Sequence, residues 1–143
     1  MNMKVIDAKG LIAGRLASQI AKQLLAGETV AVVNVSDALV SGTLKYEVGR
    51  LNSLKHQKSK QDPERSPKYP RVPQMLFKRM VRGMLPKKSS RGREALKRLR
   101  AYSGVPVTVD MSKAERYEEI AKRPPKSTTI GAMCRAFSWE PAA

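Results

Sequence analysis

The residues of this chain with the clearest chemical potential are its lysines and arginines, which concentrate in the middle of the sequence. Residues 50–100 contain 17 basic and 3 acidic residues, whereas residues 1–49 contain 5 and 4, and residues 101–143 contain 6 and 5. Lys and Arg side chains neutralise phosphates, and the planar Arg guanidinium also binds bidentately and stacks. A short charge run is usually a solvated face. So many like charges in one region repel one another and need a compensating negative partner, which favours a docking surface for a polyanion.

Other residue types that perform chemistry are scarce. His56 is the only histidine, so no His-based metal cluster or conventional Ser-His-Asp triad is expected, and we expect its side chain to be exposed or to face nucleic acid. Cys134 is the only cysteine, which excludes an internal disulfide and a Cys-based zinc site. It falls on the apolar side of a predicted helix, so we expect a buried structural thiol.

Gly10 and Gly14 flank a strand-to-helix turn that resembles a nucleotide-binding loop. The spacing is not G-x-G-x-x-G, and Asp37 is only loosely placed for the ribose-binding acid of such a fold. We therefore favour a tight turn over a cofactor site, although Arg15 at the helix start could meet a phosphate. The sequence predicts no cofactor, no metal, no small-molecule substrate and no enzymatic activity.

The basic residues lie largely on two predicted helices joined by a cationic elbow, together residues 73–104. Pro73 suits the first turn of the first helix, Gly83 permits a left-handed turn that would close it, and Pro86 prevents its continuation. Ser90 and Gly104 are the expected ends of the second helix. Each helix has one apolar stripe, Leu76, Phe77, Met80, Val81 and Met84 in the first and Ala95, Leu96, Leu99 and Tyr102 in the second.

The remaining elements predict an α/β domain with a small, mainly parallel sheet. Residues 57–72 carry Pro63, Pro67 and Pro70 with many charges, so we expect an extended loop that RNA orders. Strands are expected at 4–7, 29–35, 38–40 and 105–109, and helices at 15–25, 43–56, from a capping box at Ser112 and Glu115 up to Pro124, and around Ile130–Phe137.

Length and hydropathy predict one soluble, intracellular domain over residues 1–143, with residues 124–143 as its C-terminal segment. A chain of 143 residues is long enough for one hydrophobic core. No apolar run approaches the roughly 18 residues needed to span a bilayer, and the first residues lack a signal-peptide pattern. No membrane partner is therefore expected.

Several strings resemble a known family. Val81-Arg82-Gly83-Met84-Leu85-Pro86 is the most distinctive, and Val5–Gly10, Gly14–Ser18, Val32–Val35 and Val40–Gly42 extend the match. On these residues the chain resembles the universal family of large-subunit ribosomal protein thirteen, over at least residues 4–106. The direct Gly27–Val30 connection, the Arg71–Pro73 string and the segment from Ile130 to Trp139 are similar to its archaeal-type branch.

This resemblance implies a three-layer α/β/α fold with a basic helical extension, and a structural role in the ribosome of the cytoplasm. The implied partners are large-subunit (23S-type) ribosomal RNA and neighbouring large-subunit ribosomal proteins. A non-ribosomal nucleic-acid-binding or translation-regulatory protein is the alternative, and an RNA-modifying enzyme is disfavoured because no catalytic set is present.

The predicted RNA-binding residues are mainly cations of the loop and the elbow, of which we expect half to two-thirds to contact RNA. Tyr69 is included because it could stack on an unpaired base, although packing of its ring against a helix of the protein itself is an equal alternative. The full set is Lys55, Lys58, Lys60, Arg65, Lys68, Tyr69, Arg71, Lys78, Arg79, Arg82, Lys87, Lys88, Arg91, Arg93, Lys97 and Arg98.

Overall fold

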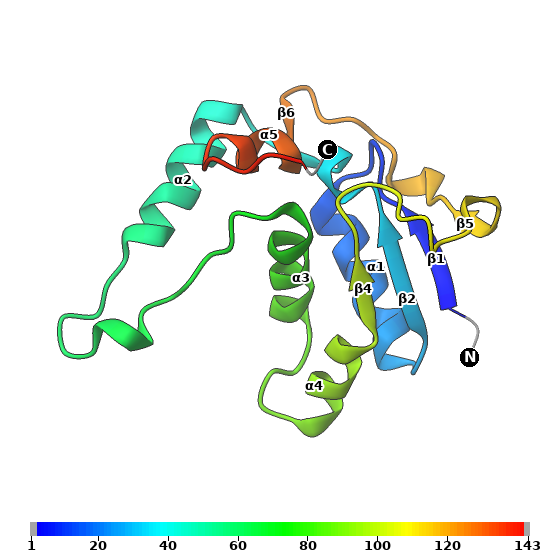
Figure 1. Ribbon diagram of the computed structural model, residues 1–143, viewed down its shortest axis with the longest axis horizontal. Coiled ribbons are helices and arrows are strands. Elements are labelled where there is room, and N and C mark those ends of the chain that lie inside the picture. The colour runs from blue at the N-terminus through cyan, green and yellow to red at the C-terminus, as the bar shows by residue number, and fades with distance from the viewer. Residues whose placement is uncertain (1–2, 142–143) are drawn as a thin grey trace.

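A four-stranded parallel sheet forms the centre of the molecule in the computed structural model, which describes residues 3–141 (Figure 1). The strand order is β4-β2-β1-β5, with β1 at Met3–Asp7, β2 at Thr29–Val33, β4 at Leu99–Ala101 and β5 at Ala114–Glu115. The central strand β2 is almost entirely buried, as its run of β-branched residues predicts. The sheet and its flanking helices confirm the predicted α/β class.

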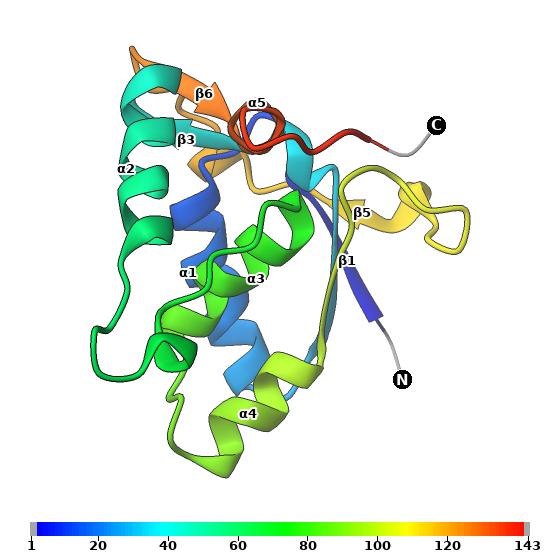
Figure 2. The same cartoon turned by 60° about the vertical axis from the view of Figure 1, so that its left-hand side comes forward.

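Helices cover one face of this sheet. Helix α1 (Ala13–Leu25) buries an apolar stripe at helical spacing and packs against both α3 (Pro73–Met84) and α4 (Ser90–Lys97). Figure 2 shows these three helices together beside the sheet. Ile6, Phe77 and Leu99 are fully or almost fully buried in the core that they share, so α3 and α4 are fixed to the sheet through α1 and β4.

The other face of the sheet is covered by a segment of the chain without a long helix. Val5 and Val33 point to this face and pack with Val109, while Tyr102 and Ala114 lie against the same cluster. The 3-10 turn η3 (Met111–Lys113) leads from this covering segment into β5.

Two predictions for this later part of the chain were wrong. Residues 105–109 form no strand, because they cross the second face of the sheet with Val109 buried and Val107 fully exposed. In the described structure no α-helix lies between Ser112 and Pro124. Instead β5 pairs with β1, and a further 3-10 turn, η4 (Glu118–Ile120), comes after it. The pairing of β5 with β1, which is distant in sequence, overrides the helix start that Ser112 and Glu115 predict locally.

A second, two-stranded sheet joins the early and late parts of the chain. Strand β3 (Leu39–Ser41) was predicted within one residue, but it pairs antiparallel with β6 (Ser127–Thr129) rather than in the main sheet. Helix α5 (Ile130–Arg135) follows β6 with Thr129 as its N-cap, which confirms the predicted last helix. The 3-10 turn η1 (Val35–Asp37) lies against α5.

Helix α2 (Leu44–His56) and a long connection lie outside the sheet. The connection over residues 57–72 contains only the short 3-10 turn η2 (Pro63–Arg65) and projects away from the sheet in Figure 1. Within residues 3–141, the helices are all too short or too polar to cross a membrane.

Candidate nucleic-acid interface

The elbow between α3 and α4 is built by proline and serine rather than by a left-handed glycine. Gly83 lies inside α3 and is not among the positive-φ residues, so its predicted role in ending the helix was wrong. The helix ends because Leu85, which precedes Pro86, adopts an extended conformation with φ −100° and ψ 154°. Ser89, not Ser90, caps α4 by accepting a hydrogen bond from the Gly92 N–H at 3.2 Å.

The second helix is also shorter than predicted. It ends at Lys97, and Leu99–Ala101 pairs in parallel with residues 30–32 of β2, so neither Leu99 nor Tyr102 belongs to a helical stripe and Gly104 caps no helix. Arg98 joins helix to strand directly. This tight connection fixes α4 at the edge of the sheet.

Gly92 lets α4 approach the elbow closely. A Cβ atom at this position would lie 2.1 Å from the Pro86 carbonyl oxygen and 2.7 Å from the Pro86 carbonyl carbon. The backbone of Pro86 therefore occupies the space that any other side chain would need.

A groove runs between the end of the long connection and α3. Its volume is about 410 Å³, and its lining combines cationic with apolar side chains: Lys68, Tyr69, Pro70, Met75, Lys78, Arg79, Arg82 and Leu96. The Arg79 guanidinium carbon lies 3.8 Å from the centre of the Tyr69 ring, and its Nη1 donates to the Lys68 carbonyl oxygen at 2.9 Å. The Tyr69 ring thus packs against a side chain of helix α3, which is one of the two alternatives that the sequence left open.

A second groove of about 270 Å³ continues along the elbow. It shares Arg82 and Leu96 with the first, and its remaining lining residues are Leu85, Lys87, Gly92 and Arg93. The two grooves therefore gather Lys68, Lys78, Arg79, Arg82, Lys87 and Arg93 along one continuous depression, with no acidic residue in either lining. We call this the elbow groove.

Most of the predicted cations have no acidic partner. Three ion pairs occur within residues 3–141, between Lys4 and Glu115, Arg50 and Glu47, and Arg65 and Asp62. Of the sixteen predicted residues, only Arg65 takes part. The six cations of the elbow groove, including Arg79 with its contacts to Tyr69 and the Lys68 carbonyl, therefore have no acidic partner among the described residues. This is the electrostatic arrangement expected of a polyanion-binding surface.

Two of the predicted residues contact the protein itself at the end of α1. Arg98 is half-buried, and its Nη2 donates to the Leu24 carbonyl oxygen at 2.8 Å. Arg91 is exposed, and its Nη2 donates to the Leu25 carbonyl oxygen at 3.3 Å. The last carbonyls of a helix carry partial negative charge and lack intrahelical partners, so these arginines stabilise the C-terminal end of α1.

The remaining predicted residues lie outside the elbow groove. The Lys55 ammonium lies 4.4 Å from the centre of the Phe137 ring, which ties the end of α2 to the segment after α5. The others are exposed side chains of the long connection or of α4 and its approach, namely Lys58, Lys60, Arg71, Lys88 and Lys97. Their predicted contact with RNA stays a prediction.

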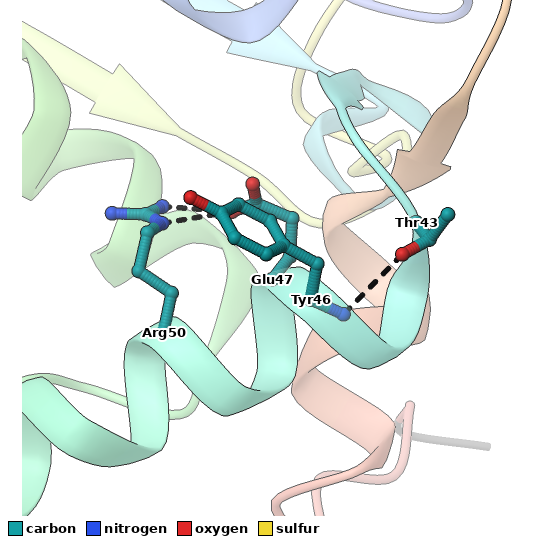
Figure 3. A network of polar contacts seen from close by, with 4 residues as sticks. All are labelled: Thr43, Tyr46, Glu47 and Arg50. Carbon is teal, nitrogen blue, oxygen red and sulfur yellow. Dashed lines mark hydrogen bonds and ion pairs between the residues drawn. The ribbon is translucent and has the colours of Figure 1, made fainter.

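Arg50, in the middle of α2, is one of the 17 basic residues of the 50–100 region, but its charge is already neutralised by Glu47. Glu47 is buried, with 4% of its surface exposed, and accepts hydrogen bonds from Arg50 Nη2 at 2.8 Å and Nε at 3.1 Å (Figure 3). Thr43 caps the helix by accepting from the Tyr46 N–H. Gly42 has φ +117°, which places its backbone against Glu47. Both Arg50 nitrogens donate to the same oxygen, Oε2, of the buried Glu47, and this charge-assisted contact makes Arg50 a structural residue.

Met75 and Pro70 line the elbow groove but were not among the predicted RNA-binding residues. Met75 is 52% exposed although it lies on a helix with a well-defined apolar stripe. It precedes the buried Leu76 by one residue and so falls off the stripe, which is the signal that the sequence offered.

The other candidate centres have structural explanations. Gly10 has φ +72°, and its N–H donates to the Asp37 carbonyl oxygen, so this segment forms a tight turn. Burial raises the pKa of the Cys134 thiol from its ordinary value near 9 to about 11, with Lys55 lowering it slightly. In residues 3–141, no cluster of three or more His, Cys, Asp or Glu side chains is arranged to hold a metal ion.

Comparison with known proteins shows clear similarity over most of the chain. A family model described as Ribosomal protein L13 matches residues 1–108. A Large ribosomal subunit protein uL13 of Methanopyrus kandleri is 47% identical over 115 residues, covering 78% of this chain and 68% of that protein. Proteins of the same name from Archaeoglobus fulgidus (48% over 115 residues, 80% and 72% covered) and Aeropyrum pernix (42% over 143 residues, 95% and 90% covered) are also similar. Their archaeal origin agrees with the predicted branch.

Proposed function

Because the chain belongs to the ribosomal protein L13 family, we propose that it is a structural constituent of the large ribosomal subunit that binds and organises large-subunit ribosomal RNA. Members of this family are structural components rather than enzymes. The proposal places the chain in the ribosome of the cytoplasm, beside other large-subunit proteins.

One observation carries the RNA-binding part of the proposal. Six cations line the elbow groove, and none of them has an acidic partner among the described residues. Phosphates of a folded RNA would supply the missing negative charge, and release of their counterions would drive binding. Because α3 and α4 are anchored to the sheet through a buried core, the groove holds these charges at fixed spacing, which suits recognition of the shape of a folded RNA.

Charge reversal at the centre of the elbow groove tests this proposal. Arg82 is exposed and lines both parts of the groove, so Arg82→Glu should leave the melting temperature nearly unchanged and weaken binding to large-subunit RNA by roughly tenfold. Lys113→Glu is the matched control, because it changes net charge equally at an exposed position beside β5, the strand at the opposite edge of the sheet from β4. It should leave RNA affinity close to that of the wild type.

Salt dependence provides the second readout. If the six cations neutralise six phosphates, the slope of log affinity against log salt should be about −4 to −5, and Arg82→Glu should make it shallower by about 1. A slope near zero, or equal losses in the two variants, would contradict the proposal. Equal affinity for duplex DNA and for folded ribosomal RNA would favour a general nucleic-acid binder instead.

A further inference from the structure

We propose that the part of the elbow groove between the long connection and α3 takes up a single unpaired nucleotide of the bound RNA. This inference rests on the proposed function and adds a class of ligand to it. The first observation is the shape of the site: a hollow of about 410 Å³, which lies in the range of small-ligand sites. A flat basic surface would be enough for phosphate contacts alone.

The chemistry of the lining separates into two kinds. Tyr69, Pro70, Met75 and Leu96 supply apolar surface, while Lys68, Lys78, Arg79 and Arg82 supply positive charge. A nucleotide is divided in the same way, with a planar, largely apolar face on the base and a negative charge on the phosphate. The absence of an acidic residue from this lining favours RNA over a basic peptide.

One wall of the groove is already a stacked pair. The Arg79 guanidinium is held over the Tyr69 ring at 3.8 Å and fixed by its 2.9 Å hydrogen bond to the Lys68 carbonyl. Unpaired RNA bases stack on aromatic rings and on guanidinium planes, so this pair is a preorganised platform whose orientation does not have to be fixed at binding. Met75 leaves 52% of its surface exposed in the same groove, which provides apolar area for a base to cover.

The test compares two RNA hairpins that differ only in one nucleotide. One carries a single unpaired 2-aminopurine in its stem, and the other is fully paired. At one fixed ionic strength, the wild type should bind the first about tenfold more tightly, and the fluorescence of the 2-aminopurine should change as it stacks. Binding of the paired hairpin reports the phosphate contacts of the proposed function separately.

Three variants test whether the preference for the hairpin with the unpaired nucleotide comes from this part of the elbow groove. Met75→Ser should reduce the preference for the unpaired nucleotide by roughly fivefold and leave affinity for the paired hairpin unchanged. Arg79→Lys, which keeps the charge but loses the guanidinium plane, should also reduce it. Met84→Ser is the matched control and should change neither affinity. Met84 was predicted to belong to the apolar stripe of α3, but it is 45% exposed, a value close to that of Met75, and it lies outside the groove lining.

The outcomes are distinguishable. If neither hairpin binds with salt-dependent affinity, the proposed function itself fails. If both bind equally well, or if Met75→Ser and Met84→Ser behave alike, the groove takes up no nucleotide and the inference is overturned. It is also overturned if Met75→Ser leaves both affinities unchanged but prevents incorporation into the large subunit, since the groove would then receive a neighbouring protein.

Discussion

Substituting the two glycines of the elbow by alanine should have opposite effects on stability. Gly83 lies in α3 with nothing within 4 Å of an added Cβ and with no positive φ, so Gly83→Ala gains helix propensity at no steric cost. At Gly92 an added Cβ would meet the Pro86 carbonyl oxygen at 2.1 Å and its carbonyl carbon at 2.7 Å. Backbone atoms cannot rotate away, so α4 or the elbow must move.

The magnitude follows from that contact. Restoring an ordinary separation of 3.4 Å requires a displacement of roughly 1.3 Å between α4 and Pro86. Overpacking of this kind costs about 1–3 kcal/mol, more than the roughly 0.5–1 kcal/mol that alanine gains over glycine in a helix. Gly92→Ala should therefore lower the free energy of unfolding by about 1–2 kcal/mol, or the melting temperature by roughly 3–8 °C. Gly83→Ala should leave it unchanged or raise it by a few degrees.

Thermal melting of the free protein, followed by circular dichroism, measures both variants under identical conditions. Binding to ribosomal RNA should weaken in Gly92→Ala, because Arg93 and Lys87 on either side of the contact would shift relative to Arg82. A Gly92→Ala protein that melts at or above the wild-type temperature would refute the reasoning, since α4 could not then be seated on Pro86. Destabilisation by Gly83→Ala would show that this glycine needs a conformation other than helix.

Further predictions concern the two arginines at the end of α1 and the buried thiol of Cys134. Arg98→Met should lower the free energy of unfolding by about 1–2 kcal/mol in thermal melting by removing the charge-assisted hydrogen bond to Leu24, whereas Arg91→Met, at an exposed 3.3 Å contact, should change it by no more than about 0.5 kcal/mol. The pKa of Cys134 is raised to about 11, so the stability that the protonated thiol provides is complete below pH 9 and is lost as the pH rises towards 11, by on the order of 1–3 kcal/mol. Urea unfolding at several pH values should show this loss in the wild type and not in Cys134→Ala.

The elements that the sequence predicted correctly are those whose signal is local. Helix α1 repeats its apolar residues over more than three turns, and β2 is a nearly continuous apolar run rich in β-branched residues, so periodicity and composition suffice for both. Residues 99–101 have no such signal. Leu96 and Leu99 are three residues apart, which fits a helix, and only the pairing with β2 makes the second of them part of a strand.

The candidate site divides in the same way between local and nonlocal information. The sequence shows that cations are concentrated in residues 50–100, but it does not show which of them contact the protein itself and which remain unpaired. Arg79 stacks on Tyr69, Arg98 binds the end of α1, and Arg65 pairs with Asp62, although all three are arginines of one basic region. The Arg65 pair is local, three residues apart, whereas Arg98 depends on a partner that folding brings to it, Leu24, which is 74 residues away.

The structural arginines explain how a surface of unpaired cations can be held on so small a domain. Repulsion within the elbow groove opposes folding of the free protein, and it must be offset by contacts that do not use the groove's own charges. The buried core beneath α3 and the contact of α4 with Pro86 are of this kind, because they are apolar or backbone contacts. Arg98 adds a cation whose charge is directed to the C-terminal end of α1, away from competition for phosphates. The scaffold is therefore stabilised by contacts that do not need an acidic partner for the groove's cations, which leaves their charges for the RNA that we propose the chain binds.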